Sequence, residues 1–241
     1  MNQITSNYPA KQRYWGSIAR EYNQWRLGSP ARRFIWGREF RLLERIVREQ
    51  IEEGSTILDA PTGTGRFLSL FENLGHKAAG IDISADMLKA QNNLSRTHNA
   101  LLLRGDCEKL PFGNGSFDYI FSLRFLGHVP PEVRVRVLQE FKRVARKGMI
   151  VGYPVLNSSF TRVKFELGNL RYKLKNGRPR PWWPASPQSL AEELERSSLK
   201  ITREVSLLGP FSQIVFLHLT EADSCTFPAK TAARQVHLAS A

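Results

Sequence analysis

The stretch Ile57-Leu58-Asp59-Ala60-Pro61-Thr62-Gly63-Thr64-Gly65-Arg66 decides the predicted fold of this 241-residue chain. An apolar run ends in an acidic residue and leads through a turn into a helical pattern, as at the carboxyl end of a buried parallel strand. Open parallel sheets bind nucleotide-like ligands at this point, and Gly63 and Gly65 would let the main chain approach a ligand closely. The helix that follows would favour partial negative charge at its N-terminus. Two glycines alone are also compatible with a plain tight turn.

Short apolar runs alternate with amphipathic stretches on both sides of this turn, which is typical of βαβ units around a parallel sheet. The glycine and proline positions support the helix limits, since Pro131 suits a first helical turn and Gly148 suits a helix end. An earlier helix over residues 31 to 53 has one apolar face and one basic face. Its apolar face comprises Ile35, Leu42, Leu43, Ile46 and Val47, and its basic stripe comprises Arg38, Arg41, Arg45 and Arg48. We expect strands at 56 to 59, 77 to 82, 101 to 105, 117 to 122 and 149 to 153, with helices at 66 to 74, 85 to 94 and 131 to 146.

The regular alternation ends after Tyr153. Residues 157 to 187 are basic and rich in proline, glycine and tryptophan, and we interpret them as an insertion shaped like a lid. An N-capped helix at 186 to 197 follows, and then strands at 200 to 208 and 211 to 219 joined by a turn at Gly209-Pro210. The predicted units are therefore an N-terminal helical cap (1 to 54), a sheet domain (55 to 220) and a flexible tail (221 to 241).

Two common nucleotide-binding patterns fail at the first turn. Leu68 stands where the third glycine of GxGxxG would be needed, and no Gly-Lys-Ser/Thr follows as in a P-loop. The ligand is therefore expected to be a nucleoside without a pyrophosphate.

Acidic residues also end the next two predicted strands. Asp82 is placed to accept hydrogen bonds from both ribose hydroxyls, although it could instead cap the following helix, a task that Ser84 could also perform. Asp106 could accept a hydrogen bond from an adenine amino group, while the backbone at Cys107 could donate to a ring nitrogen. Three acids at three neighbouring strand ends predict a nucleoside pocket.

Composition and charge narrow the class of protein. The chain has 41% hydrophobic and 24% charged residues, which is the usual composition of a globular protein. It has no apolar run long enough to cross a bilayer, and its first residues do not resemble a signal peptide. We therefore expect a cytoplasmic protein. Two cysteines without metal-ligand spacing predict neither a disulfide framework nor a metal site. The net charge of +13 concentrates in residues 1 to 50 and 161 to 181, which suits an anionic partner or a solvated basic face.

Four motifs then resemble class I S-adenosylmethionine-dependent methyltransferases, of the broad methyltransferase type 11 group that includes the ubiquinone and menaquinone C-methyltransferases. The motifs are the turn at 59 to 65, residues 80 to 84 with Met87-Leu88, residues 105 to 112 with 116 to 118, and residues 122 to 129. The resemblance covers residues 55 to 155. It implies an α/β fold with a Rossmann-like seven-stranded sheet, helices on both faces and a final strand inserted antiparallel, with N-terminal helices and a basic insertion added.

The resemblance also assigns parts of the cofactor to residues. Asp59, Ala60, Pro61, Gly63 and Gly65 would hold the methionine part of S-adenosylmethionine, whose product is S-adenosylhomocysteine. The ribose would bind Asp82, the base would bind Asp106 and Cys107 and pack on Ile83 and Met87, and Ser122 and Leu123 would line the methyl donor. Pro61 departs from the family by replacing the first glycine, so the turn must work without that amide.

Candidates outside these motifs are fewer. Tyr14 and Tyr22, near Trp15 and Trp25, resemble aromatic residues that close over the cofactor in related enzymes, although core packing explains them as well. His128 is the candidate general base, with a structural role in its loop as the alternative. Arg124 could orient an acidic acceptor.

We therefore expect a methyltransferase that acts on a small-molecule or lipid-like acceptor. An anionic acceptor, or peripheral contact with a membrane, would be compatible with the basic segments. The first alternative is an RNA methyltransferase that uses those segments to bind nucleic acid. The second is a non-catalytic scaffold that retains the fold.

Overall fold

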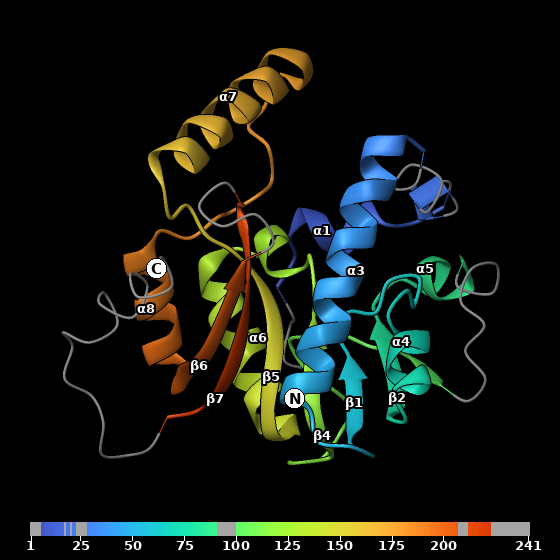
Figure 1. The fold of residues 1–241 in the computed structure, drawn as a ribbon. Helices are drawn as coiled ribbons and strands as arrows, with labels where there is room; N and C mark the ends of the chain where they lie inside the picture. Colours follow the sequence, from blue (N-terminus) through green and yellow to red (C-terminus); the bar gives the residue numbers. More distant parts are fainter. Residues whose placement is uncertain are drawn as a thin grey trace.

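The computed structural model describes residues 6–16, 18–19, 21–22, 28–90, 100–206 and 212–222. Seven strands form one sheet in the order β3-β2-β1-β4-β5-β7-β6 (Figure 1). The strands are β1 (Thr56–Asp59), β2 (Lys77–Asp82), β3 (Leu101–Arg104), β4 (Phe117–Ser122), β5 (Ala145–Pro154), β6 (Leu199–Ser206) and β7 (Ile214–Glu221). The helices are α1 (Pro9–Arg13), α3 (Pro30–Gln50), α4 (Leu68–Asn73), α5 (Ala85–Ala90), the short 3-10 helix η2 (Leu126–His128), α6 (Pro131–Val144), α7 (Ser159–Asn176) and α8 (Pro187–Arg196).

The first five strands are parallel, and β7 pairs antiparallel with both β5 and β6. This confirms the predicted seven-stranded Rossmann-like sheet with its last strand inserted antiparallel. The predicted turn at residues 209 and 210, the start of the last predicted strand at residue 211, residues 91 to 94 of one predicted helix and Trp25 lie outside the described residues, as does the tail from residue 223. The predicted division into cap, sheet domain and tail stays a prediction.

Helices cover both faces of the sheet, and the strand sequences explain how. Neighbouring residues of a strand point to opposite faces, so Leu58 and Ile120 join the core under α6 and α8. Ile57 and Phe121, one position away, join the core under α3 and α4. The near-continuous apolar strands of the sequence therefore reflect burial on two sides.

The helix before β5 ends earlier than expected. We predicted a helix to residue 146 and a strand from residue 149, but α6 ends at Val144 and β5 begins at Ala145, where it pairs with Phe117 of β4. Gly148 does not end the helix, because it lies within β5. A Cβ atom there would come 2.8 Å from the carbonyl oxygen of Leu219, so glycine permits the close approach of β7.

Most of the predicted irregular insertion is a helix. The 18 residues of α7 begin with a capping box between Ser158 and Thr161 and end at Gly177, whose φ of 68° is left-handed. The cap signals are present in the sequence, but Thr161 is the one buried residue among those described in α7, so the helix lacks the core-facing apolar pattern that revealed the others.

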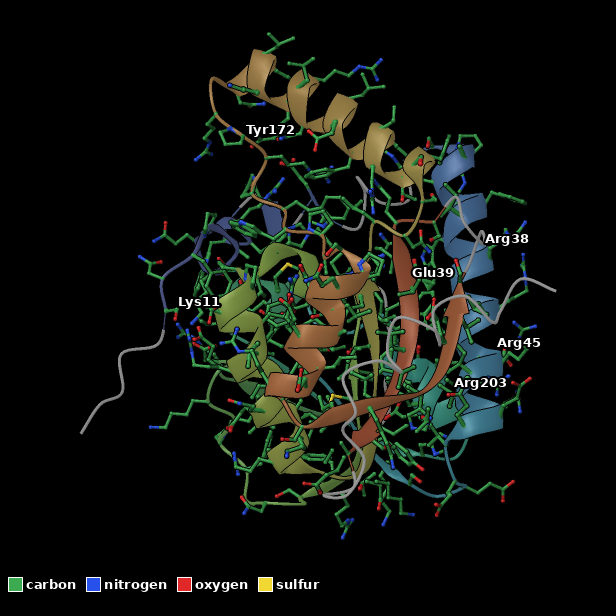
Figure 2. The ribbon with its side chains drawn as sticks, turned by 90° about the vertical axis from the view of Figure 1, so that its left-hand side faces the viewer. Lys11, Arg38, Glu39, Arg45, Tyr172 and Arg203 are labelled. Carbon is green, nitrogen blue, oxygen red and sulfur yellow. The ribbon has the colours of Figure 1, made fainter. Side chains whose placement is uncertain are left out.

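The long helix α3 matches its predicted pattern over most of its length. Leu42, Leu43, Ile46 and Val47 are buried, whereas the basic stripe is exposed, and Figure 2 shows Arg38 and Arg45 pointing away from the body. Ile35 was predicted on the apolar face but is 46% exposed, because the first turns of α3 extend past the core.

A buried ion pair joins α6 to α8. The Arg134 side chain is 1% exposed, and its Nε and Nη2 donate to Glu193 at 2.5 and 2.6 Å. Its Nη1 donates to the carbonyl oxygens of Leu126 in η2 and of Trp183 after α7, at 3.1 and 2.8 Å. The Tyr153 hydroxyl of β5 hydrogen-bonds Glu193 as well. One guanidinium thus fixes two helices and two loops.

Among the described residues, no helix is both long and apolar enough to span a bilayer.

Candidate active site

A pocket lies at the carboxyl ends of the first four strands of the sheet. It encloses about 810 Å³, including the space at its open mouth. Its walls come from the loops after β1, β2, β3 and β4, and the N-terminal residues Tyr8 to Tyr22 add a further wall. The topology of a parallel sheet therefore brings together side chains from five distant parts of the sequence.

The turn after β1 forms one wall through Pro61 and Gly63. The φ values of Gly63 and Gly65 are 59° and 67°, a left-handed conformation that favours glycine. The Gly63 N–H donates to Asp82 Oδ2 at 2.9 Å, and the Gly65 N–H donates to the Thr62 carbonyl oxygen at 3.0 Å. These amides therefore shape the turn, and Gly65 itself is absent from the pocket wall.

Asp59 and Ala60 lie beneath the turn and do not line the pocket. Asp59 is 2% exposed, and its Oδ2 accepts a hydrogen bond from the Thr62 hydroxyl at 2.8 Å. Burial raises the pKa of Asp59 to about 7, with a smaller contribution from the nearby Asp82.

The helix after the turn begins later than expected, at Leu68 and not at Arg66, and the Leu68 N–H donates to the Gly65 carbonyl oxygen at 3.2 Å. Arg66 lines the pocket instead. Its guanidinium lies over the rings of Tyr22, Trp36 and Phe67, with centroid distances of 5.8, 5.9 and 5.1 Å.

Asp82 is fixed at the tip of β2 by two backbone amides. Oδ2 accepts from Gly63, and Oδ1 accepts from the Ser84 N–H at 2.8 Å. Burial raises the pKa of this carboxyl, while the hydrogen bonds oppose the shift. Ser84 Oγ accepts from the Met87 N–H at 3.2 Å, so the serine caps α5 and the acid is left for the pocket. Ile83 and Met87 line the same wall.

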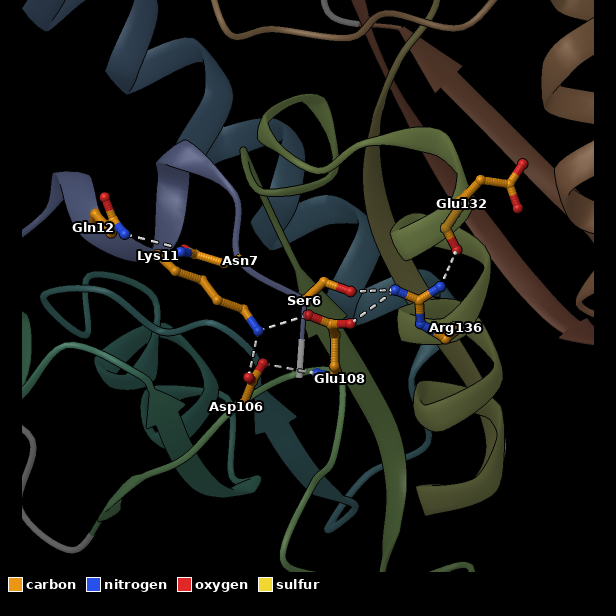
Figure 3. Close-up of polar contacts among 8 residues, drawn as sticks. All are labelled: Ser6, Asn7, Lys11, Gln12, Asp106, Glu108, Glu132 and Arg136. Atoms are coloured by element: carbon orange, nitrogen blue, oxygen red, sulfur yellow. Dashed lines mark hydrogen bonds and ion pairs between the residues drawn. The ribbon is translucent and has the colours of Figure 1, made fainter. Parts of the chain in front are cut away.

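The loop after β3 contributes Asp106 and Cys107, and a lysine from α1 reaches it (Figure 3). Lys11 Nζ donates to Asp106 Oδ2 at 2.5 Å and to Glu108 Oε1 at 2.6 Å. Asp106 Oδ1 accepts from the Glu108 N–H at 3.0 Å, and Arg136 of α6 reaches the other Glu108 oxygen at 3.2 Å. Burial raises the pKa of the Cys107 thiol well above its usual value, so this cysteine is a neutral part of the wall.

The loop after β4 supplies Leu123, Arg124, Phe125 and His128. Ser122 is fully buried behind them and does not line the pocket, and its Oγ has no hydrogen-bond partner within the described part of the chain. Arg124 donates to both carboxylate oxygens of Glu39 in α3, at 3.0 and 2.6 Å. This pairing gives Arg124 a structural role, because it ties the loop to α3.

The N-terminal residues form the wall opposite the sheet. The rings of Tyr14 and Tyr22 both line the pocket, 5.8 Å apart between centroids, and Tyr14 lies 6.5 Å from the ring of His128. The Ser84 hydroxyl donates to the Tyr14 carbonyl oxygen, and the Gly16 N–H donates to Asp86 at 2.8 Å. Both tyrosines therefore belong to the pocket wall, and their closing over a cofactor stays a prediction.

Sequence reasoning missed several wall residues, including Tyr8, Lys11, Thr62, Thr64 and Arg66. Thr62, Thr64 and Arg66 belong to the quoted turn, so their neighbourhood alone could have suggested them. Tyr8 and Lys11 gave no signal, because nothing local in the sequence indicates that α1 packs on the loop after β3.

Comparisons with known proteins agree with this geometry. Residues 57–148 match a family model described as a methyltransferase domain. Over these residues the chain is similar to a methyltransferase domain. The matched region thus runs from β1 into β5, and it contains the loops after the first four strands.

Relatives of known sequence match part of this chain. An uncharacterised protein of Methanocaldococcus jannaschii is 30% identical over 145 residues, 60% of this chain and 51% of that protein. A demethylmenaquinone methyltransferase of Staphylococcus saprophyticus is 32% identical over 113 residues, 45% of this chain and 48% of that protein. The chain thus spans about half the length of these curated relatives.

Solved structures extend the likeness of the fold beyond the matched region. The magnesium protoporphyrin IX methyltransferase of Synechocystis PCC 6803, with bound S-adenosylhomocysteine, is 17% identical with a TM-score of 0.67. That match covers 88% of this chain and 98% of the other. A methyltransferase of Methanosarcina mazei has a TM-score of 0.57 at 20% identity over 74% of this chain and 98% of the other.

Proposed function

We propose that this chain transfers a methyl group from S-adenosylmethionine to a small-molecule or lipid-like acceptor. The observation that carries the proposal is the pocket at the carboxyl edge of the sheet, where Asp82 is held by two amides and Asp106 lies in the loop after the neighbouring strand β3. The named relatives and neighbours that act on a quinone precursor and on a porphyrin support an acceptor of that size class.

The pocket residues fit the cofactor by their hydrogen-bonding capacity. Each carboxylate oxygen of Asp82 accepts one backbone N–H and has a further lone pair, so the two oxygens can accept the two ribose hydroxyls. Asp106 has one partner on each oxygen and keeps the same spare capacity for an adenine amino group. Ile83 and Met87 offer apolar surface to the base, next to Cys107.

The remaining wall suits the methionine part and the acceptor. Pro61 and Gly63 of the turn and Leu123 after β4 face the same pocket, while Asp59, Ala60, Gly65 and Ser122 would act from behind by fixing those loops. S-adenosylmethionine supplies an electrophilic methyl group on a sulfonium. The chain itself must hold the acceptor in line with that methyl group and exclude water from it. Tyr14 and Tyr22, in the wall opposite the sheet, would exclude water.

His128 is proposed as the general base for acceptors that lose a proton. Its ring lines the pocket beside Tyr14, at the mouth formed by the loop after β4. Exchange of His128 for Gln should leave the binding of S-adenosylhomocysteine unchanged and should lower turnover of such an acceptor about 10²-fold or more.

Binding of the product tests the proposal without knowledge of the acceptor. Titration calorimetry should give a micromolar Kd for S-adenosylhomocysteine with the wild type, about 10-fold to 100-fold weaker binding with Asp82→Asn, and a similar loss with Asp106→Asn. Glu195→Gln, on the exposed side of α8, is the matched control and should bind like the wild type. Circular dichroism checks that each variant is folded.

Two outcomes would count against the proposal: folded wild-type protein that binds no S-adenosylhomocysteine, or folded Asp82→Asn and Asp106→Asn proteins that bind it as tightly as the wild type. The acceptor class follows from incubation of the protein with tritiated S-adenosylmethionine and a cell extract. Tritium that partitions into organic solvent supports a lipid-like acceptor. Tritium that is released by treatment with a nuclease would identify RNA as the acceptor and would reject the proposed acceptor class.

A further inference from the structure

The helix α7 carries a row of large apolar side chains that the protein itself does not cover. Phe160, Val163, Leu167, Leu170 and Leu174 are 51, 59, 52, 53 and 78% exposed. Their spacing alternates between three and four residues, so they form one continuous stripe along the helix. We call these five residues the apolar stripe. A contiguous exposed row of this kind marks an interaction surface.

The opposite side of α7 holds the helix to the molecule. Thr161 is buried, the Phe165 ring lies 5.6 Å from the ring of Trp182, and the Asn169 side chain accepts a hydrogen bond from the Arg180 N–H at 3.0 Å. With about 3.6 residues per turn, these anchors lie roughly opposite the apolar stripe. The stripe therefore faces away from the body, and Figures 1 and 2 show α7 crossing above the rest of the molecule.

Basic side chains flank the apolar stripe on both sides. Helical spacing places Lys164, Arg171 and Lys175 along one flank and Arg162 and Lys173 along the other. All five are exposed, and the helix contains a single acidic residue. An apolar stripe between two basic flanks is the pattern of a helix that lies in a lipid interface.

We propose that α7 docks this protein onto an anionic lipid surface. The apolar stripe would enter the boundary between headgroups and acyl chains, while the basic flanks would meet the lipid phosphates. Nucleic acid would attract the cations but would leave the leucines in water. A second copy of α7 would cover the leucines but would bring like-charged flanks together, so charge complementarity favours the lipid.

Other exposed groups at the same end of the molecule fit this orientation. The first turns of α3 expose Phe34 and Ile35, by 63 and 46%, beside the exposed Arg32 and Arg33. Figure 1 shows that the start of α3 and α7 both project at the end of the molecule where the parallel strands finish. This is also the end of the sheet that holds the pocket.

The segment that returns from α7 connects it to the pocket. Trp182 packs so tightly on Gly127 that a Cβ atom at Gly127 would lie 2.2 Å from the indole Nε1, and the Trp183 N–H donates to the Gly127 carbonyl oxygen at 2.8 Å. Gly127 precedes His128 of the pocket wall. Docking through α7 would therefore hold the pocket mouth near the lipid surface. The proposed docking follows from the exposure and charge of side chains on α7 and does not depend on methyl transfer.

Sedimentation with vesicles tests the docking directly. The full-length protein should bind vesicles of phosphatidylcholine mixed with phosphatidylglycerol, bind pure phosphatidylcholine at least about tenfold more weakly, and dissociate as salt rises from about 0.1 M to 1 M. Leu167→Gln/Leu170→Gln and Lys164→Glu/Arg171→Glu should each lower the partition coefficient about tenfold or more.

The controls separate docking from general stickiness and from the proposed activity. Leu101→Gln alters a leucine that is 59% exposed at the start of β3, away from α7, and should bind vesicles like the wild type. Because the substituted side chains are exposed, all variants should keep the wild-type Kd for S-adenosylhomocysteine, which makes failure of docking distinguishable from failure of the proposed function.

Three results would overturn the docking proposal. The first is wild-type protein that sediments with neither vesicle. The second is vesicle binding that both double variants retain in full. The third is a wild-type dimer in light scattering that Leu167→Gln/Leu170→Gln converts to a monomer, which would assign the apolar stripe to self-association.

Discussion

At the scale of single residues, Asp59 lies beneath the candidate site in an environment that is unusual for a carboxyl group. It ends β1, lies almost wholly out of water and has one hydrogen-bonding side-chain partner, the hydroxyl of Thr62. Desolvation penalises its charged form, and the nearby carboxyl of Asp82 adds to this effect, so the pKa of Asp59 rises to about 7. Its protonation state therefore changes close to neutral pH.

The raised pKa of Asp59 predicts a specific pH dependence of stability. Since the pKa in the folded protein lies above the unfolded value, Asp59 stabilises the fold most below pH 4 and loses this contribution as the pH rises through about 7. Between pH 5 and 8 the wild type should lose about 2–3 kcal/mol of unfolding free energy relative to Asp59→Asn. Urea denaturation at both pH values measures the difference, and equal pH dependence in the two proteins would contradict the assignment.

Residues at strand ends could be found from the sequence, whereas their partners could not. Asp82 and Asp106 follow short apolar runs, and the rule that parallel strands end at one edge brings them together. The partner of Asp106 is Lys11, 95 residues earlier, and the partner of Arg124 is Glu39, 85 residues earlier. Such ion pairs depend on how α1 and α3 pack on the rest of the molecule. No local sequence pattern indicates that packing.

At the scale of elements, the Arg134 guanidinium positions the helix layer next to the pocket. It bridges α6 and α8 through Glu193 and also holds the carbonyl oxygens of Leu126 and Trp183. These carbonyls belong to η2, which carries His128, and to the segment that returns from α7. A single buried side chain therefore connects the core to two loops at the mouth of the site.

Removal of one partner of this ion pair should destabilise the protein strongly. Arg134→Met leaves the Glu193 carboxylate buried without its cation, and such changes cost about 3–5 kcal/mol of unfolding free energy. The double variant Arg134→Met/Glu193→Leu removes both charges and should recover more than half of that loss. Urea denaturation of the three proteins gives the values, and a double variant less stable than Arg134→Met would contradict this account.

The elements themselves were predictable where two signals agreed. Apolar runs between turn residues located β1, β2 and β4 within the observed bounds, and the serine cap located α8. The boundary between α6 and β5 was wrong, because Gly148 can end a helix or admit a close neighbouring strand, and the choice depends on β7. The helix α7 was missed because its apolar residues do not face the core.

At the scale of the whole molecule, the pocket joins parts of the chain that lie far apart in the sequence. The contacts of the N-terminal residues with the loops of the sheet include Lys11 with Asp106, Tyr14 with Ser84 and Gly16 with Asp86. All three contacts lie at the pocket wall or next to it. A ligand in the pocket would therefore contact both the N-terminal residues and the four strand-end loops, and should stabilise them together.

This coupling predicts a thermal shift of the whole protein. A ligand that binds only the folded state at a concentration of about 100 times its Kd adds about 2.7 kcal/mol to the unfolding free energy. For a chain of this size S-adenosylhomocysteine should then raise Tm by about 5–10 °C, and Asp82→Asn should show a much smaller rise at the same concentration. Scanning calorimetry measures both shifts. The basic side chains of α3 and α7 lie outside the pocket, so added salt should change the wild-type shift little. A shift that disappears with salt would indicate binding to those basic side chains instead.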